Sequence, residues 1–173
     1  MSVTLDHLTE MAAALVERFA DHGKVLATAE SCTGGMIAAG LTDIAGASSV
    51  LDRGFVTYSN AAKTEMIGVP TALIEAHGAV SDAVARAMAE GALAASRADV
   101  AIAVTGIAGP GGGSSEKPVG LVHLALASRR GSTHRVARFG DIGRAHVRRE
   151  TVALAYAMLG EWLSDQDAAT TGP

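Results

Sequence analysis

The chain has 173 residues, enough for one domain with a substantial core. Hydrophobic residues make up 49% of the sequence but aromatic residues only 3%, so Ala, Val, Leu, Ile and Met must build that core. The net charge of −4 argues against general nucleic-acid binding, and a single cysteine excludes an internal disulfide framework. Because no signal peptide or membrane-spanning stretch is apparent, we expect a cytoplasmic protein without a membrane partner.

Helical and strand patterns alternate along the chain, which predicts a single three-layer α/β/α domain with a mixed, mostly parallel sheet. The elements expected in the first half are a helix at 4–21, a strand at 24–28, a helix from 35 to about 43, a strand at 50–58, and short helices at 60–66 and 70–77. Those expected in the second half are a helix from the N-cap Ser81 to Ser96, a buried strand at 99–105, a glycine-rich loop at 106–118, a hairpin of strands at 119–127 and 133–139, and a helix at 144–163. We expect the domain to span 1–163 and 164–173 to form a disordered tail.

The segment Thr28–Gly35, with the sequence TAESCTGG, stands at the turn between the first predicted strand and the next helix. It combines a carboxylate, a thiol and hydroxyl groups with two glycines, which permit close approach to the backbone. N–H groups at a helix N-terminus favour negative charge. The segment therefore suits a nucleophile, its oxyanion or a bound phosphate, while a simple N-cap role for Ser31 or Thr33 is an equal alternative.

Two lysines near predicted loops are candidate general bases. Lys63 follows the second predicted strand, and Lys117 lies at the far end of the glycine-rich loop. A lysine in a desolvated pocket has a lowered pKa and can accept the proton of a serine hydroxyl. For Lys63 alone, an exposed position on a helix is the more common alternative.

Parallel strands place their carboxyl ends at one edge of a sheet, where binding sites usually form. If the first three strands run parallel, Ser31, Tyr58, Lys63, Thr105 and Gly106 meet at that edge. The sequence thus predicts a hydroxyl, a phenol and an amine around one pocket.

Other chemistries have weaker support. Cys32 is a rival nucleophile, although a free cysteine is more often a small buried hydrophobic residue. The six histidines lack the spacing of metal ligands, so we expect no metal, and the loop at 106–118 lacks the Gly-Lys-Ser/Thr of a P-loop. Seven of the 14 basic residues lie between Arg129 and Arg149; most fit a solvated face, but one or two suit a small anion.

Four motifs together resemble the CinA C-terminal domain family over roughly residues 13–163. They are Thr28–Gly35, Gly54–Asn60 with Lys63, His77–Ser81, and Thr105–Pro110 through Lys117–Gly120. The stand-alone members of this family are nicotinamide mononucleotide amidohydrolases, so the resemblance implies hydrolysis of that carboxamide to nicotinic acid mononucleotide and ammonia in pyridine nucleotide salvage. Larger members carry an additional N-terminal domain similar to molybdopterin-binding proteins, for which we expect no room here.

The resemblance also implies roles for particular residues and no cofactor. Ser31 matches the nucleophile and Lys63 its general base, with Tyr58 beside them. The residues expected around the substrate are Glu30, Cys32, Thr33, Gly34, Gly35, Thr105, Gly106, Gly109 and Arg144. The implied partner is a small mononucleotide, whose phosphate we expect at the glycine turn and the arginine-rich segment, and an Ala-rich surface is compatible with a homodimer or larger oligomer.

Two segments depart from the family pattern. The loop reads Gly109–Gly113 as GPGGG where many members have an aspartate in third place, and the order of residues before Arg144 is rearranged, so that Asp141 does not align. Two further hypotheses stay open: a nucleotide-binding module without catalysis, and a regulatory role in competence or damage through protein partners.

Overall fold

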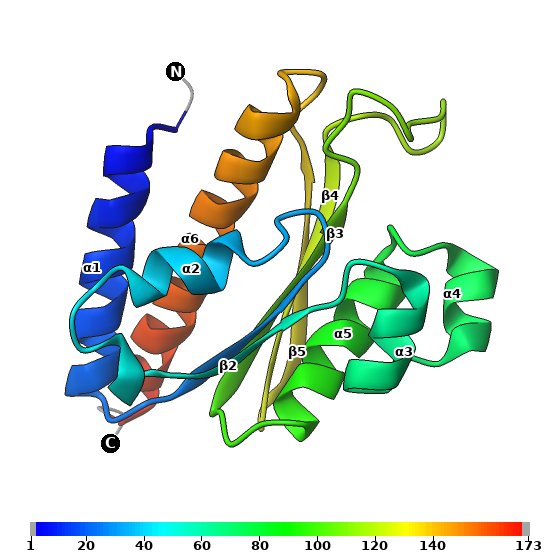
Figure 1. Ribbon diagram of the computed structural model, residues 1–173. Helices are drawn as coiled ribbons and strands as arrows, with labels where there is room; N and C mark the ends of the chain where they lie inside the picture. Colours follow the sequence, from blue (N-terminus) through cyan, green and yellow to red (C-terminus); the bar gives the residue numbers. More distant parts are fainter. Residues whose placement is uncertain (1–2, 171–173) are drawn as a thin grey trace.

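The computed structural model describes residues 3–170, which fold around a five-stranded sheet of order β2-β1-β3-β4-β5 (Figure 1). The strands are β1 (Leu26–Glu30), β2 (Leu51–Val56), β3 (Val100–Gly106), β4 (Leu121–Ser128) and β5 (Gly131–Arg138). β1 pairs in parallel with β2 and β3, whereas β4 is antiparallel to β3 and β5. Four strands therefore run in one direction, which confirms the predicted mixed, mostly parallel sheet.

Helices cover both faces of the sheet and give the predicted three layers (Figure 1). On one face lie α1 (Leu5–Asp21), α2 (Met36–Thr42) and α6 (Arg144–Thr170), and a 3₁₀ turn at Ala47–Ser49 leads into β2. On the other face lie α3 (Asn60–Ile67), α4 (Thr71–His77) and α5 (Asp82–Ala94). No helix within residues 3–170 combines the length and apolar character needed to cross a bilayer.

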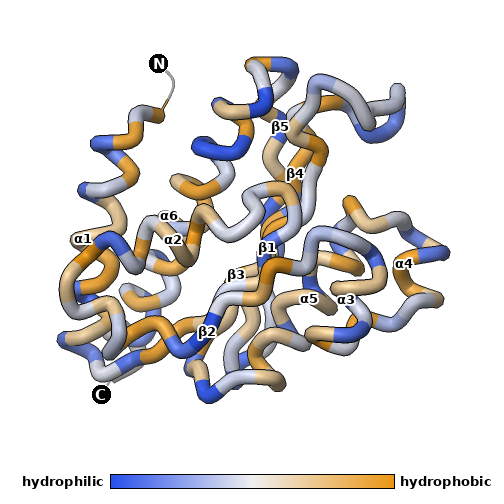
Figure 2. The backbone as a smooth tube through the Cα atoms, viewed as in Figure 1, coloured by the Kyte–Doolittle hydropathy of each residue, from blue (hydrophilic) through white to orange (hydrophobic). Residues whose placement is uncertain are grey.

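The two faces of the sheet carry side chains of different size. β3 turns Ile102 and Val104 toward α1, α2 and α6, but it turns Ala101 and Ala103 toward α5. Figure 2 shows the hydrophobic strands in the middle of the molecule and strongly hydrophilic residues on the first turns of α6. Because α5 is itself rich in buried alanine, it packs closely on the small side chains of the sheet.

Several boundaries differ from the sequence prediction, chiefly in β1, β5 and α6. β1 begins and ends two residues later than expected, and just before it the N–H of Val25 donates to the side chain of Asp99 at 2.9 Å. β5 begins at Gly131, so the hairpin has a two-residue turn. α6 continues to Thr170; the limits 1–163 and the disordered tail at 164–173 stay predictions, and 171–173 lie outside the described residues.

Candidate active site

The carboxyl ends of the three parallel strands bring separate motifs together. Ser31 directly follows β1, and its N–H donates to the carbonyl of Val104 in β3 at 3.0 Å. On the other side of β1, the N–H of Thr57 donates to the carbonyl of Glu30 at 2.8 Å. The chain then turns into α3, whose N-cap Ser59 accepts from the first turn. Sheet pairing thus fixes the position of Ser31, and α3 carries the side chain that contacts it.

Lys63 is that partner. Its Nζ lies 3.1 Å from Oγ of Ser31 and donates to the carbonyl of Thr57 at 2.8 Å. Lys63 is 1% exposed and Ser31 is 9% exposed, and no carboxylate of the described residues forms an ion pair with the amine. Burial therefore lowers the pKa of Lys63. An amine of lowered pKa beside a hydroxyl is the arrangement of a general base and its nucleophile.

A cavity of about 220 Å³ opens over this pair. Seven of its lining residues come from the predicted site and four do not. The lining residues are Ser31, Cys32, Tyr58, Asn60, Lys63, Ala79, Val80, Thr105, Gly106, Ala108 and Arg144. These four residues, Asn60, Ala79, Val80 and Ala108, fall inside motifs that the sequence singled out, but nothing in their residue types indicated a place in the wall.

Arg144 connects the two sides of the cavity mouth. Its Nη2 donates to the hydroxyl of Tyr58 at 3.1 Å, and its Nη1 donates to the carbonyl of Gly109 at 3.0 Å. Tyr58 is 60% exposed, so this pair stands at the rim rather than in the interior. Gly109 has a φ of +82°, and an added Cβ would lie 2.7 Å from Val119. The guanidinium gives the rim a positive charge beside a phenol.

Glu30 does not line the cavity, although the sequence placed it around the substrate. Its carboxylate is fully buried and accepts hydrogen bonds from Thr33 Oγ1 at 2.6 Å, from the N–H groups of Gly35 and Ile37 at 3.0 Å and from that of Ala38 at 2.9 Å. From the sequence, the N–H groups at this helix N-terminus were expected to bind an oxyanion or a phosphate. The carboxylate therefore closes the N-terminus of α2 to a ligand.

Thr33 and the two glycines of the turn likewise support the backbone. Thr33 is buried, and its carbonyl accepts from Nη2 of Arg148 at 2.7 Å. The N–H of Gly34 donates to the carbonyl of Ser31 at 3.1 Å, and both Gly34 and Gly35 have positive φ. In contrast, the N–H groups of Cys32 and Thr33 donate to no oxygen within residues 3–170.

Hydrogen bonds from two predicted candidates hold the 77–81 loop, which forms one wall. The buried hydroxyl of Thr105 donates to the carbonyl of Ala79 at 2.8 Å. Lys117, the second candidate base, donates instead to the carbonyl of His77 at 2.7 Å and does not line the cavity. Lys63 is thus the lysine that meets a hydroxyl in the cavity.

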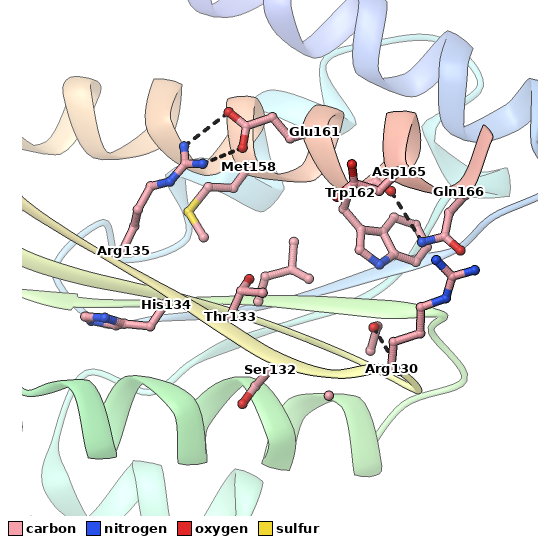
Figure 3. A pocket seen from close by; sticks show the side chains of 13 residues that line it. Arg130, Ser132, Thr133, His134, Arg135, Met158, Glu161, Trp162, Asp165 and Gln166 are labelled. Carbon is pink, nitrogen blue, oxygen red and sulfur yellow. Dashed lines mark hydrogen bonds and ion pairs between the residues drawn. The ribbon is translucent and has the colours of Figure 1, made fainter. Parts of the chain in front are cut away.

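A second hollow, of about 350 Å³, lies between β5 and α6 near the opposite end of the sheet (Figure 3). Arg130 and Trp162 line it, and Arg135 pairs there with Glu161. The hollow is larger than the cavity over Ser31, but its lining residues include no serine with a lysine beside it. Volume alone does not identify the site of chemistry in this fold.

The family model described as the CinA C-terminal domain matches residues 8–163, and the chain belongs to this family. The chain is 54% identical to the nicotinamide-nucleotide amidohydrolase PncC of Escherichia coli K12 over 142 residues, which cover 81% of this chain and 84% of that protein. The competence/damage inducible protein CihA from Agrobacterium tumefaciens has the same fold in its crystal structure, with 53% identity, a TM-score of 0.88 and coverage of 95% of this chain and 98% of that chain.

Longer relatives match over only part of their length. A CinA-like protein of Anaeromyxobacter dehalogenans strain 2CP-C is 54% identical over 145 residues, which cover 84% of this chain but 35% of that relative. A putative competence-damage inducible protein of Symbiobacterium thermophilum is 62% identical over 64% of this chain and 26% of its own length. The chain therefore spans about a third or less of these two relatives.

The environment of Cys32 bears on the rival nucleophile. The thiol is 7% exposed, and burial, assisted by the negative charge of Glu30, raises the pKa of Cys32 to about 12. The thiolate, rather than the thiol, is the nucleophile in cysteine chemistry. The sulfur of Cys32 is therefore in its unreactive form near neutral pH.

We expect iodoacetamide at pH 8 to modify Cys32 of the folded chain on the order of 10³-fold more slowly than in a denaturant, because the thiolate fraction is that much smaller. Intact-mass spectrometry over time measures both rates. Rapid modification of the folded chain would show an accessible thiolate and revive Cys32 as the nucleophile.

Proposed function

We propose that this chain hydrolyses the carboxamide of nicotinamide mononucleotide and releases ammonia and nicotinic acid mononucleotide, a reaction of pyridine nucleotide salvage. The observation that carries the proposal is the buried pair of Ser31 and Lys63, with 3.1 Å between hydroxyl oxygen and amine nitrogen. The choice of substrate is supported by the 54% identity to the Escherichia coli amidohydrolase, which this chain matches over most of both lengths.

In the proposed mechanism, the neutral amine of Lys63 takes the proton of Ser31, and Oγ attacks the carbonyl carbon of the carboxamide. The N–H groups of Cys32 and Thr33, which donate to no oxygen within residues 3–170, receive the oxyanion of the tetrahedral intermediate. When the intermediate collapses, Lys63 returns the proton to the departing nitrogen and ammonia leaves. Lys63 then deprotonates a water molecule, which hydrolyses the acyl ester and restores the Ser31 hydroxyl.

The size and rim of the cavity support a particular pose. A volume of about 220 Å³ is below the roughly 300–1,000 Å³ common for small-molecule pockets, so it suits the ring that carries the amide better than a whole mononucleotide. The ribose and phosphate then extend to the mouth, toward Arg144 and Tyr58. Because Glu30 closes the N-terminus of α2, the phosphate is placed on the guanidinium rather than on the glycine turn.

The reaction is tested by ammonia release from nicotinamide mononucleotide, with free nicotinamide as a poor substrate. We expect Ser31→Ala to lower kcat by several orders of magnitude, because a covalent nucleophile is lost. Ser48→Ala, a change of an exposed serine in the 3₁₀ turn, is the matched control and leaves kcat unchanged. Ligand binding without ammonia release would identify a non-catalytic binding module instead.

Lys63→Arg and Lys63→Met are both expected to lower kcat by about 10²-fold or more, since a guanidinium stays protonated and a thioether is no base. In the unchanged chain, kcat is expected to rise with pH as Lys63 loses its proton. Because burial lowers the pKa of Lys63, the rise is expected at a pH below the ordinary pKa of a lysine. The pH profile of kcat measures it. High activity in Lys63→Arg would leave Lys63 only an electrostatic role.

Removing the rim charge is expected to weaken recognition of the phosphate selectively. A charge-assisted hydrogen bond contributes roughly 1.5–3 kcal/mol, so Arg144→Ala is expected to lower kcat/KM for the mononucleotide by about 10- to 100-fold. Activity on nicotinamide riboside, which has no phosphate, stays the same. Arg129→Ala removes an exposed charge from the distant hairpin and serves as the control. Equal losses on both substrates would contradict a phosphate contact.

A further inference from the structure

Glu30 combines complete burial with a position next to the proposed nucleophile. Its carboxylate lies outside the cavity lining and forms no ion pair with a basic side chain of the described residues. Burying an unpaired carboxylate is costly unless hydrogen bonds compensate for the lost water. The compensation here comes from the segment that follows Ser31 along the chain.

Every partner of this carboxylate is a hydrogen-bond donor. Oε2 accepts from Thr33 Oγ1 and from the N–H groups of Gly35 and Ile37, and Oε1 accepts from the N–H of Ala38 and, at 3.4 Å, from Thr28 Oγ1. Four of the five donors lie within eight residues after Glu30. The turn from Ser31 to the first residues of α2 is therefore wrapped around one buried side chain.

The position of this wrapped segment determines where two other groups lie. The N–H groups of Cys32 and Thr33, which donate to no oxygen within residues 3–170, lie in the chain between Ser31 and the N–H groups that bind the carboxylate. Arg148 of α6 adds a hydrogen bond to this segment, to the carbonyl of Thr33 at 2.7 Å. The carboxylate fixes the peptide groups on one side of this stretch, and sheet pairing of Ser31 fixes the other.

We propose that Glu30 is a positioning residue: its carboxylate holds the turn after Ser31 in the arrangement that aligns the Ser31 hydroxyl with Lys63 and leaves the Cys32 and Thr33 N–H groups for the oxyanion. This inference rests on the proposed function. Glu30 touches neither the substrate nor the reacting atoms and acts only through the backbone of the turn. A misplacement of about 1 Å in such a group lowers a rate by about 10²-fold.

The test compares E30Q with T28V. Glutamine keeps the shape of the side chain, but its amide nitrogen faces donors that need an oxygen, so at least one anchor of the turn is lost. T28V removes the long contact from Thr28 to the same carboxylate and leaves the anchors of the turn intact. We expect E30Q to lower kcat by about 10²-fold with KM within about threefold of the original, and T28V to change kcat by less than about twofold.

A second readout is independent of the substrate. A fluorophosphonate labels an activated serine, and intact-mass spectrometry gives its rate for the unchanged chain, E30Q, T28V and the unlabelled control S31A. Circular dichroism gives the folded fraction of each variant, by which its labelling rate is divided. We expect the corrected labelling rate of E30Q to fall in parallel with kcat. If the unchanged chain labels but releases no ammonia from nicotinamide mononucleotide, the proposed function fails while the labelling rates still test Glu30.

Three results would overturn the role of Glu30. The first is labelling of folded E30Q at the rate of the unchanged chain, and the second is a loss of kcat that equals the loss of folded protein. The third is an unchanged chain that does not label at Ser31, which would also remove the nucleophile. Parallel losses of kcat and labelling in folded E30Q, with T28V unaffected, support the positioning role.

Discussion

A lysine amine held away from water and from any carboxylate of residues 3–170 is the constraint on which the candidate site depends. Burial lowers the pKa of Lys63, and the hydrogen-bond acceptors of its amine are Ser31 and Thr57. The two neighbours are placed by parallel pairing of β1 with β2 and β3, and the lysine by α3. The lowered pKa of Lys63 thus depends on both the strand pairing and the position of α3.

The small side chains on the α5 face of the sheet serve the same arrangement. α5 packs closely on alanines of β1, β3 and β4, and it in turn supports α3. At Gly91, an added Cβ would lie only 1.9 Å from the carbonyl oxygen of Ile67, so the position of α3 requires a residue without a side chain there. Small residues therefore permit the close packing of α5 both on the sheet and on the helix that carries Lys63.

The sequence was sufficient for the three layers and for the meeting of Ser31, Tyr58, Lys63 and Thr105, because strand ends and turn motifs are local signals. It was insufficient for Glu30, since a carboxylate beside a serine is equally compatible with substrate binding and with capping α2. That choice depends on which N–H groups the folded turn directs at it. The contacts of Arg144 with Tyr58 and of Arg148 with Thr33 were also beyond prediction, because they join segments more than 80 residues apart.

The helix that carries Lys63 is held only lightly by the rest of the fold. Of the eight residues of α3, only Lys63 and Ile67 are buried, so its detachment exposes little apolar surface. Detachment hydrates the amine and returns its pKa toward the ordinary value, which makes protonation and local opening mutually favourable. The docked helix consequently gains stability as pH rises from the lowered pKa toward the ordinary lysine value. Local opening of α3 thus requires less free energy than global unfolding, and it removes the base from the candidate site while the sheet stays folded.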